Sequence, residues 1–319
     1  MNARGLIFMF PGQSSRFPDM IEKLAAESPA SARLIAEASD ILDRDLARHY
    51  RADNPAIFAR NRDVQVGVFL ATHLHLKRLE DAGITAQWSL GLSLGEYNHL
   101  VHIGALAFDA ALRLIEVRGQ LYEQGTPGCM AVVFPIDADT VEQAIADLGL
   151  VGRVVIGLYN SPRQQVLSGE REAVARLGAA LEEEHLVELV ESEPNIPMHA
   201  PTFAPVAVEF RQVLERTRFE SPRLPYVPNV TAEVLAGAAP DQIRTCLAAH
   251  VCEPVLWKAS VDAVAAQVPA AHFIEVGPGS VLHNLFGRGW TPGSRARTDG
   301  AEDWTRHVQG LAAELGHGA

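Results

Sequence analysis

A serine flanked by glycines lies at residues 91–95, which read Gly-Leu-Ser-Leu-Gly. The G-x-S-x-G pattern is typical of a sharp strand-to-helix turn that exposes a serine hydroxyl for nucleophilic attack. Residues 86–90 can form the strand before this turn, and residues 96–103 can open the helix after it. The backbone N–H of Leu94 would then face a developing oxyanion. The pattern predicts nucleophilic chemistry on Ser93, with an ordinary turn as the alternative.

A serine nucleophile needs a base that takes its proton, and the chain offers twelve histidines. His99 and His102 follow the predicted turn, but their helix would carry them away from the hydroxyl. His199 stands in the loop of residues 195–201, where a histidine taken alone is more often structural. The residue types alone therefore leave the base open.

A third candidate site residue is an arginine on an apolar helix face. On a helix that begins near Asp109, Arg118 falls within the stripe formed by Ala111, Leu114, Ile115 and Tyr122. A buried guanidinium must be paired, and its planar fork suits a carboxylate. That carboxylate could belong to a substrate or to a buried Asp or Glu of the chain.

The composition excludes several classes of function. The net charge of −12 argues against nucleic acid as a partner. Apolar stretches are short and interrupted, so no transmembrane helix is expected, and the first residues lack the features of a signal peptide. The three cysteines form no metal-binding pattern, and their odd number fits the reducing cytoplasm. We expect a cytoplasmic protein without a bound metal.

The order of predicted elements indicates an α/β fold with a mainly parallel sheet. Residues 129–191 read as strand, helix, strand, strand, helix, strand, which is the ferredoxin-like order. We interpret them as a small subdomain inserted into a large domain of residues 1–128 and 192–319. The active site would lie in the cleft between the two.

Further elements are expected in the large domain. The sequence predicts these: a strand at 6–10, helices near 17–26, 29–48, 64–82, 109–124 and 201–216, strands near 225–230 and 272–276, a loop at 287–300 and a terminal helix at 303–315.

Six motifs occur in one order along the chain. They are Phe10-Pro11-Gly12-Gln13-Ser14-Ser15, Gly91-Leu92-Ser93-Leu94-Gly95-Glu96-Tyr97, Val117-Arg118-Gly119, Asn160-Ser161-Pro162, Pro197-Met198-His199 and Glu275-Val276-Gly277-Pro278-Gly279. This order and spacing resemble the malonyl-CoA:acyl carrier protein transacylases and the acyltransferases of polyketide synthases. The resemblance extends from about Ile7 to Leu285 and implies an α/β-hydrolase-like large domain with the ferredoxin-like insertion.

The resemblance also implies roles for the catalytic residues. Ser93 and His199 would form a Ser–His dyad, with the imidazole oriented by a backbone carbonyl of the segment 253–257. The backbone N–H groups of Gln13 and Leu94 would hold the oxyanion. Ser14 and Arg16 depart from the family pattern beside Gln13, where a Gly and a Gln are usual.

The same comparison assigns the acyl-binding residues. Arg118 would grip the free carboxylate of malonyl or methylmalonyl, and Gln65 would line the site. Leu92 replaces the histidine that most of the family carries before the nucleophile, and Met198 precedes the catalytic histidine. Leu92 makes the site more apolar, and the position of the bulky but pliable Met198 helps to set tolerance for α-substituents in the family, so together they leave the identity of the acyl group open. Asn160 and Asn229 match family asparagines and read as mainly architectural.

The sequence therefore predicts a stand-alone acyltransferase that moves a malonyl or substituted malonyl group from CoA, or from a carrier protein, to an acyl carrier protein. Acyl-CoA and acyl carrier protein would be its partners, and no cofactor, nucleic acid or membrane is implied. An acyl hydrolase that clears carrier proteins and a transferase of an unusual non-malonyl acyl group are alternatives. A catalytically inactive carrier-docking protein and an unrelated esterase fit the sequence less well.

Overall fold

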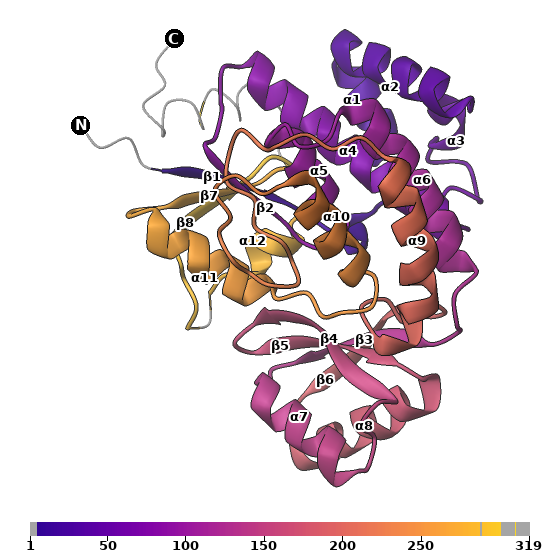
Figure 1. The fold of residues 1–319 in the computed structure, drawn as a ribbon, viewed down its shortest axis with the longest axis vertical. Helices are drawn as coiled ribbons and strands as arrows, with labels where there is room; N and C mark the ends of the chain where they lie inside the picture. Colours follow the sequence, from indigo (N-terminus) through magenta and orange to yellow (C-terminus); the bar gives the residue numbers. More distant parts are fainter. Residues whose placement is uncertain (1–4, 288, 301–309, 311–319) are drawn as a thin grey trace.

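The computed structural model describes residues 5–287, 289–300 and 310 of the chain. They form two layered units, a large domain and a smaller subdomain that lies at its lower end in Figure 1. The predicted terminal helix at 303–315 lies outside the described residues, apart from residue 310.

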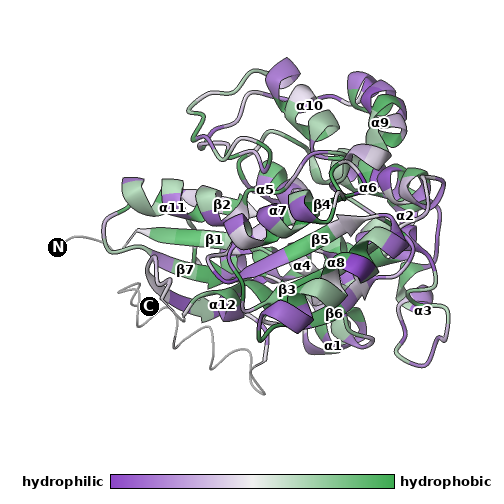
Figure 2. Cartoon of the chain, turned by 90° about the horizontal axis from the view of Figure 1, so that it is seen from below, coloured by the Kyte–Doolittle hydropathy of each residue, from purple (hydrophilic) through white to green (hydrophobic). Residues whose placement is uncertain are grey.

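A parallel sheet forms the centre of the large domain. Its strands are β1 (Leu6–Phe10), β2 (Trp88–Gly91), β7 (His272–Glu275) and β8 (Ser294–Arg297), in the order β2-β1-β7-β8. Every residue of β1 is buried, as expected for an inner strand covered on both faces. In Figure 2 the strands β1 and β7 carry the hydrophobic colour, while hydrophilic residues gather on outer helix faces.

Helices and short 3-10 turns surround this sheet. They are η1 (Gln13–Ser15), α1 (Met20–Glu27), α2 (Pro29–Leu42), α3 (Leu46–His49), α4 (Asn61–Asp81), α5 (Gly95–His102), α6 (Phe108–Glu123), η2 (Pro201–Phe203), α9 (Ala204–Arg216), α10 (Pro240–Ala249), α11 (Trp257–Gln267) and α12 (Val281–Leu285).

The small subdomain has an antiparallel sheet and two helices. Its elements are β3 (Cys129–Phe134), α7 (Ala138–Asp147), β4 (Val154–Ser161), β5 (Gln164–Gly169), α8 (Arg171–Glu184) and β6 (Glu188–Glu193). The strand order β4-β5-β3-β6 is that of a ferredoxin-like fold. Val133, Val141, Leu167 and Leu177 belong to a hydrophobic core of its own. The predicted α/β fold with this insertion is confirmed.

Three local predictions are wrong. The predicted helix 29–48 is divided in two, because Asp43 adopts a left-handed conformation (φ 51°) that ends α2. No strand forms at 225–230, since Pro225 and Pro228 lack the N–H that a ladder needs. Residue Tyr226 only makes an isolated bridge with Leu235.

The third error is the loop predicted at 287–300, which contains β8. This strand pairs in parallel with β7 at the edge of the sheet. Its sequence Ser-Arg-Ala-Arg is polar because an edge strand is only partly covered, so the hydrophobic signal of a buried parallel strand is missing.

Within the described ranges, no helix is both long and apolar enough to cross a bilayer.

Candidate active site

Ser93 lies at a strained turn between β2 and α5. Its φ is +51°, a left-handed conformation that non-glycine residues rarely adopt. The two flanking glycines permit this turn by close approach: a Cβ on Gly91 would lie 2.1 Å from the carbonyl carbon of Gly95, and one on Gly95 would lie 2.1 Å from the carbonyl oxygen of Phe10. The strain persists because the backbone around it has no room to relax.

Asn229, distant in sequence, holds this turn with its side-chain amide. Its Oδ1 accepts a hydrogen bond from the Ser93 N–H at 2.7 Å, and its Nδ2 donates to the Gly91 carbonyl at 2.6 Å. All of these groups are buried. The asparagine therefore satisfies the N–H of the nucleophile and the carbonyl two residues before it.

Asn229→Ala is expected to lower the free energy of unfolding by about 2–4 kcal/mol, because it leaves two buried backbone groups without partners. Urea denaturation measures this value. Asn160→Ala is the matched control: the Asn160 amide donates one part-buried bond to Gln164 at 3.1 Å, so its loss is expected to cost about 1 kcal/mol. Equal stability of the two variants would contradict the role given to Asn229.

His199 lies against the nucleophile. The Ser93 hydroxyl donates to its Nε2 at 2.8 Å, although 106 residues separate the two in sequence. Burial, together with the nearby positive charge of Arg118, lowers the pKa of His199 to about 3. The imidazole is therefore neutral near pH 7 and able to accept a proton from Ser93.

The carbonyl that orients the imidazole belongs to His250. Nδ1 of His199 donates to this carbonyl at 2.7 Å. The expected segment 253–257 does not supply this carbonyl, but its first residue, Glu253, makes a second backbone hydrogen bond that also favours the charged form of His199. His250 caps the C-terminus of α10, where the last carbonyls of a helix lack an intrahelical N–H donor. The end of α10 thus supplies a free acceptor that the sequence pattern did not reveal.

Two backbone N–H groups are available beside Ser93. Gln13 begins η1 immediately after Gly12, and Leu94 caps the N-terminus of α5. Neither N–H donates a hydrogen bond to another residue in the described part of the chain. Two free donors on either side of a nucleophile fit an oxyanion site.

A cavity of about 250 Å³ opens onto Ser93 between the two domains. Its lining combines the predicted residues Gln13, Leu92, Asn160, Met198 and His199 with apolar side chains of the small-subdomain sheet. Those apolar residues are Met130, Val132, Leu158 and Val166. Leu94, Gln65 and Arg118, also predicted as site residues, do not line this cavity.

Arg118 and Gln65 instead contact each other in the interior. Nη1 of Arg118 donates to Oε1 of Gln65 at 2.7 Å, and Gln65 in turn donates to Asn61. The guanidinium carbon lies 4.3 Å from the ring centre of Tyr122. Nε and Nη2 of Arg118 are buried without a hydrogen bond in the structure. No described carboxylate lies within 4.0 Å of this guanidinium, so the alternative interpretation, a structural pair with a buried Asp or Glu, finds no partner among the described residues.

Sequence reasoning missed Glu193, which faces the cavity from β6. Its Oε1 accepts from Gln13 Nε2 at 2.7 Å and from Arg16 Nη1 at 3.0 Å. The carboxylate thereby joins the turn that carries Gln13 to the small subdomain. A glutamate in an irregular strand gives no local signal of such a contact.

His99 and His102 are excluded as the base by their contacts. Nδ1 of His99 lies 2.7 Å from the hydroxyl of Ser89, and Nδ1 of His102 lies 2.9 Å from the same oxygen. Ser89 belongs to β2, so both rings are engaged at the sheet rather than at the nucleophile, in agreement with the expectation from sequence.

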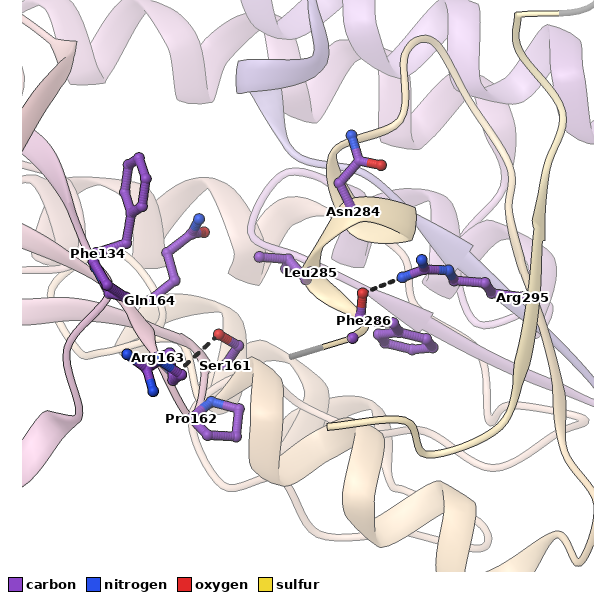
Figure 3. Close-up of a pocket in the computed structure, with 11 residues that line it drawn as sticks. Phe134, Ser161, Pro162, Arg163, Gln164, Asn284, Leu285, Phe286 and Arg295 are labelled. Atoms are coloured by element: carbon purple, nitrogen blue, oxygen red, sulfur yellow. Dashed lines mark hydrogen bonds between the residues drawn. The ribbon is translucent and has the colours of Figure 1, made fainter. Parts of the chain in front are cut away.

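A second cavity, of about 480 Å³, adjoins the first because Gln164 and Leu285 line both. In Figure 3 residues of the small subdomain border one side, and residues of α12 and β8 border the other. Arg163 and Arg295 bring positive charge to this cavity. The guanidinium of Arg295 donates to the backbone carbonyls of His283 and Phe286, which fixes it at the wall.

Comparison with known proteins gives a consistent result. A family model described as acyl transferase domain matches residues 7–309. The chain is 32% identical to the malonyl CoA-acyl carrier protein transacylase of Escherichia coli over 286 residues, which cover 88% of the chain and 91% of the relative. It is 29% identical to the polyketide biosynthesis malonyl CoA-acyl carrier protein transacylase BaeC of Bacillus velezensis, with coverage of 89% and 96%.

Solved structures agree with these sequence relatives. A type II polyketide synthase acyl-carrier protein in complex with its malonyl-transacylase matches with a TM-score of 0.88 and 28% identity, over 96% of this chain and 99% of that one. FabD from Acinetobacter baumannii matches with a TM-score of 0.89 and 26% identity, over 98% and 100%. The elbow at Ser93, the two-domain fold and these matches together show that the chain belongs to the acyl transferase domain family, which includes the malonyl CoA-acyl carrier protein transacylases.

Proposed function

We propose that this acyltransferase moves a malonyl group from CoA to the thiol of an acyl carrier protein through an ester on Ser93. The observation that carries the proposal is the 2.8 Å hydrogen bond between Ser93 and His199 at a strained turn that borders a cavity. The names of the relatives supply the malonyl group and the carrier protein as substrates.

In the first half-reaction, Nε2 of His199 takes the proton as the Ser93 oxygen attacks the thioester carbonyl. The N–H groups of Gln13 and Leu94 stabilise the oxyanion, which then collapses and expels the CoA thiolate. His199 returns the proton to that sulfur. In the second half-reaction, His199 deprotonates the carrier-protein thiol, whose sulfur attacks the acyl ester, and the proton returns to the Ser93 oxygen.

The long thioester donors need a path to Ser93. The two adjoining cavities provide such a path between the domains. A pantetheine arm extending from Ser93 would pass Gln164 and Leu285, and Arg163 with Arg295 would meet its phosphate.

Arg118 is the candidate for recognition of the malonyl carboxylate. Its Nε and Nη2 have no hydrogen bond in the structure, and a buried charge without a counterion is costly. A ligand carboxylate could accept two parallel hydrogen bonds from that side of the guanidinium. This supports a carboxylated acyl group rather than an uncharged one.

Arg118→Ala is expected to reduce malonyl transfer about 100-fold or more, because the loss of one partner of a buried charge pair costs about 2–5 kcal/mol. Acetyl transfer should change little, since acetyl has no carboxylate. Loading of Ser93 from malonyl-CoA and from acetyl-CoA, measured beside a thermal melt, checks this.

Arg113→Ala is the matched control, because Arg113 is exposed on the same helix. Equal loss of malonyl and acetyl transfer together with a lowered melting temperature would assign Arg118 a purely structural role. Hydrolysis of the acyl enzyme faster than transfer to carrier protein would instead favour the acyl hydrolase.

A second candidate substrate is a larger acyl group without a carboxylate. The apolar lining formed by Leu92, Met198, Met130 and Val132 favours it. Competition between malonyl-CoA and medium-chain acyl-CoAs for loading of Ser93 separates the two, and preferential loading of the uncharged chain would replace malonyl as the substrate.

A further inference from the structure

A buried acid–base pair lies directly behind the dyad and takes no part in the steps above. Glu96 follows the nucleophile by three residues on α5 and is fully buried. Its Oε2 lies 3.2 Å from Nδ1 of His250, whose side chain is 1% exposed. Its Oε1 accepts a hydrogen bond from the hydroxyl of Tyr226 at 2.5 Å. The pair is thus enclosed by the large domain.

His250 connects this carboxyl to the base in two ways. Its backbone carbonyl accepts the hydrogen bond from Nδ1 of His199, and its ring stacks on the His199 ring with the centroids 4.8 Å apart and the planes at 25°. Glu96 therefore contacts the residue that both orients and covers the catalytic imidazole.

Several polar atoms of the pair lack a hydrogen bond among the described residues. Oε2 of Glu96 and both ring nitrogens of His250 make no hydrogen bond in the structure. Burial raises the pKa of Glu96 to about 7, against the opposing effects of the Tyr226 hydroxyl, a backbone hydrogen bond from Asn229 and the charge of Arg118, and burial lowers the pKa of His250. Tyr97 on α5 and Cys246 on α10 are the other titratable neighbours whose protonation the carboxyl affects.

Acyl transfer creates a positive charge on His199, next to this pair. When His199 takes the proton of Ser93, an imidazolium forms in a closed site. The positive charge of Arg118 already acts on this site and disfavours the imidazolium. An anion nearby lowers the free energy of that imidazolium, because the interior screens charges weakly. Many serine enzymes use a carboxylate bonded to the histidine for this purpose, whereas here a carbonyl occupies that position.

We propose that Glu96, acting through His250, offsets the positive charge that forms on His199 and is a positioning residue for acyl transfer. The inference rests on the proposed acyl-Ser93 chemistry. No proton has to leave the pair during the reaction: the ionised carboxylate keeps its charge while His199 gains and returns the proton of Ser93.

Glu96→Gln tests this, because the amide keeps the shape and can still accept from Tyr226 while it removes the charge. Stopped-flow loading of Ser93 from malonyl-CoA is followed between pH 5.5 and 8.5. Wild type should accelerate about 10- to 100-fold as pH rises through 7, whereas the variant should be flat and equal to wild type at pH 5.5. KM should not change, and His199, with its pKa of about 3, adds no step in this range.

Glu96→Gln should affect the stability of the fold and the rate of loading in opposite directions at high pH. A carboxyl whose pKa is raised on folding contributes stability that is complete below its ordinary pKa and is lost as pH rises through 7. Glu96→Gln should therefore melt at the same temperature as wild type, or higher, at pH 8, where its loading is slowest relative to wild type. A merely structural glutamate would couple slow loading to a lowered melting temperature, and that result would overturn the proposal.

Tyr226→Phe is the matched control, because it removes one hydrogen bond from Glu96 and leaves the charge. It should retain the pH-dependent step, moved to higher pH. A loss of the step in Tyr226→Phe, or a wild-type step retained in Glu96→Gln, would contradict the inference. Loading of wild-type Ser93 tests the proposed function separately, since the inference can fail while that ester still forms.

Discussion

Ser93→Ala is expected to reduce transfer of acyl groups to carrier protein by about a million-fold, the size of effect seen when a serine enzyme loses its nucleophile. The N–H groups of Gln13 and Leu94 can still bind the thioester carbonyl of the substrate. Without the Ser93 oxygen, however, no acyl ester can form. Mass spectrometry of the protein after incubation with malonyl-CoA should show no added acyl mass. The rate of release of CoA measures the residual activity.

The variant should fold normally. The hydroxyl of Ser93 contributes one hydrogen bond to His199, and Ala tolerates the turn about as well as Ser. As a control, the melting temperature of the variant should lie within a few degrees of that of wild type. If another residue of the variant became acylated to the same extent as Ser93 of wild type, the assignment of Ser93 as the nucleophile would be wrong.

His199→Ala is expected to slow the loading of Ser93 by about 10⁴-fold, because general-base catalysis and the nucleophile act as one unit. The ester should still form on Ser93, so the variant separates the base from the nucleophile. Single-turnover loading from malonyl-CoA gives the rate directly.

His102→Ala serves as the comparison variant. Its ring contacts Ser89 rather than Ser93, so loading should stay within a few fold of wild type. If His102→Ala proved as slow as His199→Ala, the loss would reflect general disturbance of the large domain and not the removal of a base.

Much of the fold could be predicted because its signals are local. The glycines at 91 and 95 specify a turn in which any Cβ would collide with backbone, so the elbow is readable from five residues. The alternating and helical patterns within 129–191 specify the order of elements that defines the insertion. Arg118 was predicted to be buried because it interrupts an apolar stripe, and its side chain is indeed enclosed.

Other features depend on contacts between distant segments. The His250 carbonyl is available because α10 ends there, and no residue type marks a free carbonyl in a sequence. Glu193 meets Gln13 across the two domains, 180 positions apart in sequence. The edge strand β8 has a polar sequence that reads as a loop until its partner β7 is known.

The catalytic and binding roles given to individual residues remain predictions. The structure places Ser93, His199 and the cavity together, whereas Gln65 and Arg118 lie apart from the cavity lining. Recognition of a substrate carboxylate by Arg118 is part of the proposed function and is tested by the Arg118→Ala variant.

The most direct test of the central claim is a chase of the loaded enzyme. Wild type is incubated with malonyl-CoA, freed of excess donor, and mixed with an acyl carrier protein that bears its phosphopantetheine thiol. Intact-protein mass spectrometry then follows both proteins. The account predicts a malonyl ester on Ser93 that disappears as malonyl appears on the carrier protein. Loss of the ester to water with an unmodified carrier protein, or no ester at all, would contradict it.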